Sequence, residues 1–257
     1  MDSEALLMED SFIVEQKMID GGLLVVKETE QLKWFEYAGF STQSVMNKHK
    51  PTQILTPVSR SLLLFLLFKQ APLSILNLGL GGAGLERALV TIPNLTLTAV
   101  EASQSIIDMA TSYFNLPKEV KVFCQKAEQY VDHTTEVYDV VICDLFIGEK
   151  SPYFLFSDHF YQQIVNITCD QAVLMINLQA DTNLQLFNAL SAIKKQFPHI
   201  ALVEFTDYSN IVLICSLQKI PNLSMLIKDT TELTQSILFD IDSLLAKVIY
   251  IPNSEVS

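Results

Sequence analysis

Basic side chains are scarce in this chain of 257 residues: Lys and Arg together number 17, whereas Asp and Glu number 29. The formal net charge at pH 7 is therefore -12. Nucleic acids favour surfaces with clustered Lys and Arg, so this charge argues against a nucleic acid partner. It is compatible with a cationic small molecule. Hydrophobic residues make up 49% of the chain and charged residues 18%, which indicates a globular protein and not a disordered one.

Cysteine and histidine are also few, and neither shows a metal-binding spacing. No two cysteines form a Cys-x-x-Cys pair and the histidines are scattered, so we expect no metal site. Three cysteines lie in apolar, strand-like runs and one at a helix-to-strand junction, which predicts buried free thiols in a reducing compartment. The cysteines are Cys124, Cys143, Cys169 and Cys215, and the histidines are His49, His133, His159 and His199.

Long apolar runs are missing from the sequence. The longest uninterrupted run, Leu62–Phe68, is bounded by Arg60 and Lys69 and is far too short to span a membrane. The chain also opens without the basic-then-apolar pattern of a secretion signal. We therefore expect a soluble cytoplasmic protein with no membrane partner.

Glycine is limited to eight residues, yet four of them lie between positions 79 and 84. The apolar run Ile75–Leu78 precedes these glycines, and a helical pattern over 85–89 follows them. This order predicts a buried strand, a tight turn and a helix. Because glycine has no Cβ, such a turn lets a ligand approach the backbone closely. Gly79, Gly81 and Gly82 are therefore candidate cofactor-binding residues, although such glycines can also serve packing alone.

A second apolar run, Leu95–Glu101, ends in a carboxylate downstream of the glycine turn. Ser103 is a predicted N-cap, and a helix is predicted over 104–114. An acid at the end of the second strand can accept hydrogen bonds from ribose hydroxyls. Glu101 is therefore a candidate nucleoside ligand; the alternative is a solvated acid that favours the N-terminus of the next helix.

Strands and helices alternate from Leu73 onward, which is typical of a parallel sheet covered by helices on both faces. Two later strands are joined by only three residues and must therefore be antiparallel. The pattern predicts an α/β, Rossmann-like, nucleoside-dependent transferase fold, with a mostly parallel sheet and an antiparallel pair at its edge. The predicted parallel strands are 74–79, 95–101, 120–124, 138–143 and 171–178, and the antiparallel pair is 200–206 and 210–216.

The N-terminal segment has a different pattern. Apolar runs at 12–14 and 23–26 flank Asp20-Gly21-Gly22, which is a hairpin signal, and 34–37 can add a third strand. We predict two domains, namely a small N-terminal β-hairpin cap over 1–45 and a Rossmann-like nucleoside-binding catalytic domain over 46–257. Two further helices are predicted over Val58–Phe68 and Thr230–Lys247.

The fourth predicted strand delivers an acid to the carboxyl end of the sheet. Tyr138–Cys143 is largely apolar and Asp144 follows it directly. Because ligands of open α/β sheets bind beyond these strand ends, Asp144 is a candidate active-site residue. The alternative is a cap of the following turn. The loop 145–152 has the character of a lid.

Motifs around Asp144 carry a resemblance to a known family. The strand reads Tyr-Asp-Val-Val-Ile-x-Asp over 138–144, and Ser-Pro-x-x-Leu-Phe-Ser-x-x-Phe-Tyr follows over 151–161. Glu101 and the Ala-x-x-Tyr-Phe string over 110–114 extend the match. These motifs resemble the spermidine synthase family of polyamine aminopropyltransferases, which has the class I S-adenosylmethionine-dependent methyltransferase fold. The resemblance covers roughly residues 40–216.

The resemblance implies a transferase that moves an aminopropyl group from decarboxylated S-adenosylmethionine to a small-molecule amine, without a metal. By resemblance, Asp144 grips the amine and takes its proton, and Tyr208 lies where the family binds the polyamine. The alternative for Tyr208 is an edge-strand aromatic. Gln43 resembles a glutamine that contacts the donor. The cap of this family also implies a homodimer.

Several positions depart from the family's pattern. Gly82 stands where the family carries an acid for the donor's ammonium, a loss that can weaken binding by about tenfold to a hundredfold. Ile147 stands where a second acid is expected, so Glu149 or Asp158 would have to contact the far ammonium of the acceptor. Arg60 places a positive charge where the helix entry usually carries an acid.

The adenine contact departs as well. Lys126 replaces an acid, and a basic side chain cannot accept a hydrogen bond from an exocyclic amine. The neighbouring Ala127 keeps the family's small residue, and the adenine contact is either lost or moves to Gln125 or Glu128.

Three interpretations remain open: an aminopropyltransferase with altered substrate contacts, a methyltransferase that uses ordinary S-adenosylmethionine, and a catalytically degenerate nucleoside-binding paralogue. Outside the candidate site, Arg87 is expected to form a structural ion pair.

Overall fold

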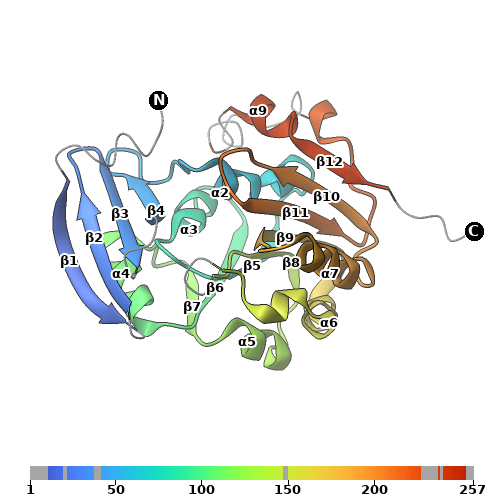
Figure 1. Ribbon diagram of the computed structural model, residues 1–257, viewed down its shortest axis with the longest axis horizontal. Coiled ribbons are helices and arrows are strands. Elements are labelled where there is room, and N and C mark those ends of the chain that lie inside the picture. The colour runs from blue at the N-terminus through green and yellow to red at the C-terminus, as the bar shows by residue number, and fades with distance from the viewer. Residues whose placement is uncertain are drawn as a thin grey trace, which may run out of the picture.

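The computed structural model describes residues 11–19, 22–37, 42–146, 150–226, 237 and 240–252, with the backbone alone at residues 42 and 43. The described chain forms two sheets, one of four strands and one of eight. The four-stranded sheet stands at one end of the molecule beside α4 (Gln104–Tyr113), and the eight-stranded sheet crosses the rest (Figure 1).

The large sheet has the strand order β12-β10-β11-β9-β8-β5-β6-β7. The predicted mixed α/β fold with a mostly parallel sheet is confirmed, because five of these strands run parallel and β11 and β10 continue the sheet antiparallel from β9. The parallel strands are β5 (Leu73–Leu78), β6 (Leu95–Glu101), β7 (Lys121–Cys124), β8 (Tyr138–Cys143) and β9 (Thr168–Gln179), and the antiparallel ones are β10 (His199–Glu204) and β11 (Asn210–Ser216).

The strand β12 (Val248–Ile251) is absent from the sequence prediction. It pairs antiparallel with β10, so the predicted antiparallel pair lies one strand inside the edge of the sheet. A strand of four residues is stabilised by a partner distant in the sequence, which a local pattern does not reveal. Of the helix predicted over 230–247, the structure describes α9 (Ile241–Leu245), and much of the remainder lies outside the described residues.

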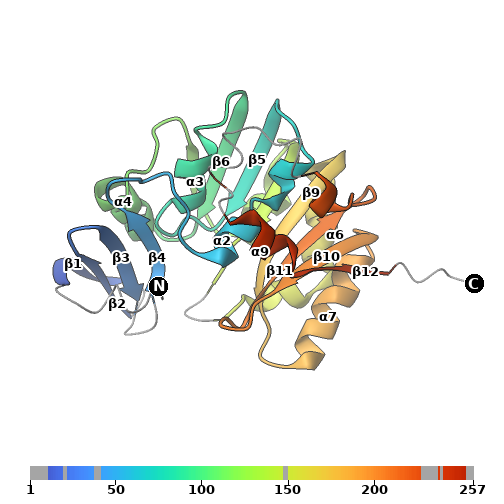
Figure 2. The same cartoon turned by 90° about the horizontal axis from the view of Figure 1, so that it is seen from above.

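Helices cover both faces of the large sheet (Figures 1 and 2). One face carries α2 (Pro57–Ser61), α3 (Gly84–Leu89) and α9, and the other carries α5 (Ala127–His133), α6 (Asp158–Asn166) and α7 (Asn183–Lys194). Burial on both faces explains why the central strands read as nearly continuous apolar runs. None of the helices in the described part of the chain combines the length and the apolar character needed to cross a membrane.

The helix predicted over Val58–Phe68 is wrong in its extent. The α-helix α2 ends at Ser61, and a separate 3-10 turn, η1, spans Leu64–Leu67. The side chains of residues 62–65 are all fully buried. A segment that buries every side chain has no solvent-facing stripe, so its contacts and not its periodicity decide the geometry.

The N-terminal sheet contains four antiparallel strands, one more than the sequence pattern indicated. Their side chains Leu24, Val26 and Phe35 pack against Phe114, at the end of α4. The rings of Phe35 and Phe114 meet edge to face at 5.7 Å. The proposed domain boundary at residue 45 falls within the fourth strand. The strands are β1 (Phe12–Ile19), β2 (Gly22–Glu28), β3 (Leu32–Tyr37) and β4 (Thr42–Asn47).

The four cysteines are free thiols, and their burial differs. Cys143 and Cys215 are buried as predicted, Cys169 is half-buried and Cys124 is exposed. The prediction is wrong for Cys124 because β7 is an edge strand of the sheet, which leaves the end of the strand open to solvent.

Candidate functional site

The glycine turn joins β5 to α3 at the carboxyl end of the sheet. Gly79 has φ +96° and Gly81 has φ +50°, a region of backbone conformation that favours glycine. A Cβ at Gly79 would lie 2.2 Å from the carbonyl oxygen of Asp144, so only glycine lets β5 approach the end of β8 this closely. The turn and Asp144 therefore meet directly.

The three predicted cofactor-binding glycines have different surroundings. A Cβ at Gly82 would lie 2.5 Å from Oγ of Ser44, whereas a Cβ at Gly81 would have no neighbour within 4 Å. Protein atoms therefore occupy the space beside Gly79 and Gly82, and open space adjoins Gly81. A ligand that approaches the bare backbone of this turn would do so at Gly81.

Glu101, at the end of β6, binds the glycine turn. Its Oε2 atom accepts a hydrogen bond of 3.2 Å from the backbone N–H of Leu80, and its Oε1 atom accepts one of 2.9 Å from Ser103. Burial raises the pKa of Glu101, and these backbone hydrogen bonds oppose the rise. Each carboxylate oxygen has a second lone pair, so these bonds leave capacity for ribose hydroxyls.

Asp144 is oriented by side-chain amides from neighbouring strands. Its Oδ1 atom accepts a hydrogen bond of 2.8 Å from Nδ2 of Asn177 on β9, and Oδ1 of Asn177 accepts one of 2.9 Å from Nδ2 of Asn210 on β11. Burial raises the pKa of the Asp144 carboxyl group, and the bond from Asn177 opposes the rise. The side chain is half-buried. A carboxyl group held in this way has the position and the basicity of a proton acceptor.

A second acid, Glu86 on α3, lies close to this group and is missing from the sequence prediction. Nδ2 of Asn77 donates hydrogen bonds of 2.7 Å to the carbonyl oxygen of Gly79 and of 2.5 Å to Oε1 of Glu86. The pKa of Glu86 is raised to about 7, chiefly by burial and in smaller part by the charge of Asp144, while the hydrogen bond from Asn77 opposes the rise. The sequence did offer one signal for this contact. Asn77 is a polar residue inside the apolar run of β5, and a buried amide needs a polar partner.

The ion pair predicted for Arg87 is wrong. Its guanidinium group donates to the backbone carbonyl oxygens of Pro51, Gly82 and Phe114. No carboxylate of the described residues lies within ion-pair distance of it. The guanidinium group is buried among loop carbonyls, and burial lowers its pKa to about 10. Arg87 therefore ties the glycine turn to α4 and to the segment before α2.

Arg60 and Tyr208 lie close enough for their charges to interact. Arg60 is buried on α2; burial lowers its pKa, and the charges of Asp240 and Tyr208 oppose the change. Tyr208 lies between β10 and β11, with 38% of its surface exposed and its ring edge to face with Phe205 at 6.0 Å. A positive charge therefore lies close to the residue predicted to bind a polyamine.

Ala127 and Glu128, the predicted residues of the adenine contact, lie at the start of α5. Ala127 is buried at the start of α5, and Glu128 is half-buried in the first turn of that helix. Gln43 is part of β4, but its side chain is not among those described, and Glu149 lies outside the described residues. Asp158 is exposed and forms an ion pair with Lys195.

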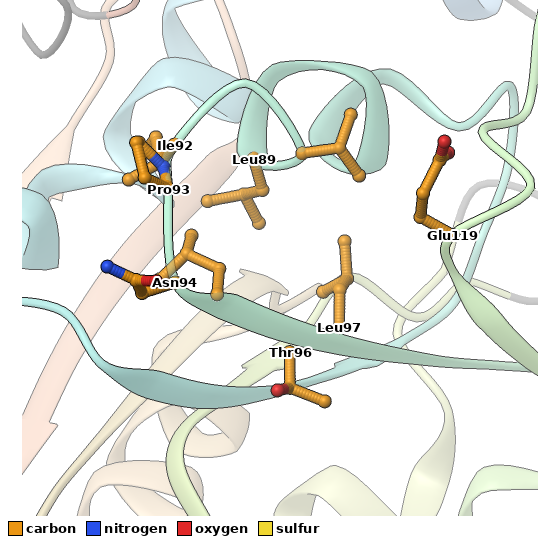
Figure 3. A pocket seen from close by; sticks show the side chains of 9 residues that line it. Leu89, Ile92, Pro93, Asn94, Thr96, Leu97 and Glu119 are labelled. Carbon is orange, nitrogen blue, oxygen red and sulfur yellow. The ribbon is translucent and has the colours of Figure 1, made fainter.

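A hollow of about 560 Å³ lies between the end of α3 and the start of β6, lined by Leu89, Asn94 and Leu97 among others (Figure 3). It adjoins the amino-terminal end of β6, whereas Glu101 ends the same strand. The hollow is therefore separate from the candidate site. Within the described residues, no group of three or more His, Cys, Asp or Glu side chains is arranged to hold a metal ion.

No family model matches the chain. Among curated proteins, a polyamine aminopropyltransferase of Neisseria meningitidis is 26% identical over 157 residues, which make up 59% of this chain and 60% of that protein. An eEF1A lysine and N-terminal methyltransferase of Xenopus laevis is 27% identical over 163 residues, or 58% of this chain and 23% of that protein. The match thus spans less than two thirds of the length of these relatives.

Solved structures extend the likeness to nearly the whole chain. A probable spermidine synthase of Corynebacterium glutamicum has a TM-score of 0.76 at 16% identity and covers 95% of this chain and 92% of its own. A spermidine synthase in complex with the transition state analogue AdoDATO has a TM-score of 0.65 at 17% identity, with coverages of 94% and 85%. Human Methyltransferase-like protein 13 in complex with SAH has a TM-score of 0.60 at 21% identity, with coverages of 79% and 98%.

These structural likenesses show the fold, which is that of spermidine synthases and of S-adenosylmethionine-dependent methyltransferases. The resemblance to polyamine aminopropyltransferases inferred from the sequence motifs is confirmed, because curated relatives carry that name and the structural neighbours include spermidine synthases.

Proposed function

We propose that this chain is an aminopropyltransferase-like enzyme that moves an aminopropyl group from decarboxylated S-adenosylmethionine to an amine acceptor. Asp144 carries the proposal, because its backbone touches the glycine turn at Gly79 and Asn177 orients its carboxyl group. The turn and Glu101 would receive the nucleoside, with Gly81 as the point of backbone approach. Gln43, Ala127 and Glu128 stay proposed donor contacts, and Tyr208 and Glu149 proposed acceptor contacts.

In the proposed reaction the amine nitrogen attacks the aminopropyl carbon that is bonded to the sulfonium. A nitrogen–carbon bond forms while the carbon–sulfur bond breaks, and sulfur keeps the electron pair and leaves as methylthioadenosine. A primary amine with a pKa of about 10.4 is almost wholly protonated at neutral pH, and its deprotonation costs about 4–5 kcal/mol. Asp144 accepts this proton, and burial raises its pKa and so makes it a stronger base than an exposed aspartate.

Turnover with the decarboxylated donor tests the proposal. The purified chain is incubated with decarboxylated S-adenosylmethionine and a panel of monoamines, diamines and triamines, and methylthioadenosine is measured by mass spectrometry. We expect methylthioadenosine to form only when an amine is present. Product formation that does not depend on an amine, or none with any amine, would contradict the proposed transfer.

A methyltransferase is the second candidate function. Gly82 lacks the acid that would favour a donor without a carboxylate, and Arg60 adds a buried positive charge near the site. Methyltransferases are also among the relatives and the structural neighbours. The same assay with ordinary S-adenosylmethionine distinguishes the two, since methyl transfer yields S-adenosylhomocysteine. A chain that binds methylthioadenosine but turns over neither donor would be the degenerate paralogue.

We also propose that the N-terminal sheet joins two copies in a homodimer. Phe12, Ile13 and Met18 on β1, an edge strand, have exposed fractions of 56%, 57% and 64%. Light scattering during gel filtration is expected to give twice the mass of the chain. A single-chain mass at micromolar concentration would contradict the homodimer.

A further inference from the structure

Glu86 is a buried acid to which the proposed reaction gives no role. Its side chain has an exposed fraction of 0%, and its Oε2 atom has no hydrogen-bond partner. A buried carboxylate without a full set of partners costs free energy. Such a group needs an explanation beyond packing.

The side-chain amide of Asn77, which contacts Glu86, also has a buried oxygen atom without a hydrogen-bond partner. Nδ2 of Asn77 donates to Gly79 and to Glu86, which fixes the orientation of the amide and leaves its Oδ1 atom buried without a partner. Two buried acceptors, Oε2 of Glu86 and Oδ1 of Asn77, therefore belong to side chains that contact each other. What both atoms lack is a hydrogen-bond donor.

The cations in the described part of the chain do not supply this donor. Arg87 follows Glu86 directly in the chain, but its guanidinium group is directed to the backbone carbonyl oxygens of Pro51, Gly82 and Phe114. None of the ion pairs among the described residues includes Glu86. The charge of Arg87 favours the ionised form of Glu86 without a hydrogen bond to it, and the charge of Asp144, which follows β8 and has the same sign as Glu86, opposes that form.

The two acids share one side of the sheet. Side chains alternate along a strand, so Asn77 follows Ile75 and Asp144 follows Ile142 on the face that α3 covers. Asn77 and Ile142 are paired in the register of β5 and β8. Glu86, Asn77 and Asp144 therefore gather at the carboxyl end of adjacent strands, beneath the helix that the glycine turn begins.

We propose that the ammonium group of the donor's aminopropyl arm binds to Oε2 of Glu86 and Oδ1 of Asn77, beside Asp144. An alkylammonium carries one positive charge and three N–H donors, which matches a site where the Asn77 oxygen and two carboxyl groups, once ionised, offer acceptors only. Glu86 then takes the role of the acid missing at Gly82. The side chain of Ser44 occupies the space that such an acid would need, because a Cβ at position 82 would lie 2.5 Å from Oγ of Ser44.

This inference rests on the proposed function, since it needs a donor that carries a free ammonium group. Because the Glu86 side chain has no exposed surface, the arm displaces a neighbouring side chain when it enters. The charge of Asp144 acts on Glu86, so Asp144 lies close to the proposed ammonium site. Binding of the ammonium would therefore bring the carbon under attack close to the proposed proton acceptor.

Binding of two ligands tests the site: decarboxylated S-adenosylmethionine, which has the ammonium, and methylthioadenosine, which lacks it. Calorimetry compares the wild type with Glu86→Gln, which keeps the size of the side chain and replaces Oε2 with an N–H donor. We expect Kd for the decarboxylated donor to rise by about tenfold to a hundredfold, with Kd for methylthioadenosine nearly unchanged. Equal losses for both ligands, or none for either, would overturn the assignment.

Glu101→Gln is the matched control, because its carboxylate faces the turn and not the ammonium. It is expected to weaken both ligands by the same factor. Should Glu86→Gln fail to fold, the wild type itself offers a second measurement. The ratio of the two Kd values is expected to grow in favour of the decarboxylated donor as pH rises and Glu86 and Asp144 ionise; a ratio that does not change with pH would refute the site.

The outcomes separate this site from the proposed reaction. Transfer by the wild type, together with unchanged donor discrimination in Glu86→Gln, refutes the role of Glu86 and leaves the aminopropyl transfer standing. The opposite outcome is also distinguishable. If Glu86→Gln abolishes the preference for the decarboxylated donor over methylthioadenosine, and the wild type forms no methylthioadenosine with any amine, the ammonium site is supported and the transfer is refuted.

Discussion

Asn177 donates a hydrogen bond of 2.8 Å from its Nδ2 atom to Oδ1 of Asp144. Its own Oδ1 atom accepts a bond from Asn210, so two strands that follow later in the chain orient the acid at the end of β8. Asn177 is almost fully buried, with an exposed fraction of 6%, which holds the amide in place. The proposed proton acceptor is therefore positioned by residues far from it in the sequence.

Replacing this amide is expected to change the pH dependence of transfer. Asn177→Leu removes a hydrogen bond that lowers the pKa of Asp144, so that pKa rises further. The acid limb of the kcat/KM profile is expected to move to higher pH, and activity near neutral pH to fall about tenfold. Asn210→Leu serves as the control, with a smaller shift, because Asn210 contacts Asp144 only through Asn177. Identical profiles for the wild type and Asn177→Leu would contradict the proposed orientation.

Asp144→Asn separates catalysis from nucleoside binding. The substitution keeps an oxygen that can accept from Asn177 but removes the base, so we expect transfer to be lost. Methylthioadenosine binding is expected to stay within about twofold, because this ligand has no alkylammonium group for Asp144 to deprotonate. Mass spectrometry of the product and calorimetry of the ligand make the two measurements. If binding and transfer fell together, Asp144 would have an architectural role.

Two glycines of the turn are expected to respond differently to alanine. Gly79→Ala places a Cβ 2.2 Å from the carbonyl oxygen of Asp144 at φ +96°, so we expect a loss of about 3 kcal/mol or more in the free energy of unfolding. Gly81→Ala meets no neighbouring atom and keeps φ +50°, which costs about 1–2 kcal/mol.

Denaturant unfolding gives both values. Methylthioadenosine binding is the second readout, since the new methyl group at position 81 enters the space assigned to the ligand. A Gly81→Ala protein that binds this ligand as well as the wild type does would place the nucleoside elsewhere.

Glu86 links stability to pH in a direction opposite to that of a salt-bridged acid. Its pKa is raised from 4.5 to about 7 in the folded chain, so between these values the folded state binds more protons than the unfolded state. The free energy of unfolding therefore falls as pH rises through this window, by about 3 kcal/mol in total. Glu86→Gln removes the titration, so the substituted protein is expected to be the more stable one near pH 8.

The difference between the two proteins is expected to shrink towards about pH 5, where Glu86 is protonated in the folded chain. Urea unfolding at both pH values measures it. A difference that does not vary with pH would show that Glu86 is already charged at the lower pH. Higher stability combined with weaker donor binding in Glu86→Gln would indicate that the acid is kept for the ligand.

Arg87→Met is expected to destabilise the fold strongly. The guanidinium group is the donor to three backbone carbonyl oxygens, and methionine leaves all of them without it. We expect a loss of at least about 3 kcal/mol in the free energy of unfolding, with Arg87→Lys intermediate because an ammonium reaches fewer acceptors. Chemical denaturation measures both variants. A loss below about 1 kcal/mol for Arg87→Met would mean that water replaces these bonds.

The apolar pattern predicted where β5, β6, β8, β9 and the two antiparallel strands lie along the chain, because a strand buried on both faces leaves a continuous apolar run. It failed for residues 62–65 and for β12. Residues 62–65 are completely buried, so their sequence shows no alternation between an apolar and a polar face. The four-residue strand β12 depends on pairing with β10, which is distant in the chain. The hydrogen-bond partners of Arg87 could not be predicted either, since every residue has a backbone carbonyl group and the sequence does not show which of them lie near the guanidinium group.

By itself the sequence determined the alternation that makes this an α/β protein, the glycine turn, and the two acids Glu101 and Asp144 at strand ends. These features are local: a strand, its end and the turn that follows are adjacent in the chain. Only the tertiary structure decided that Asn177 donates to Asp144 and that Ser44 fills the space beside Gly82. It alone also showed that Glu86 and Asn77 each have a buried oxygen atom without a hydrogen-bond donor. Each of these depends on which segments face one another, and hydrogen bonds across such distances follow from packing and not from neighbouring residues.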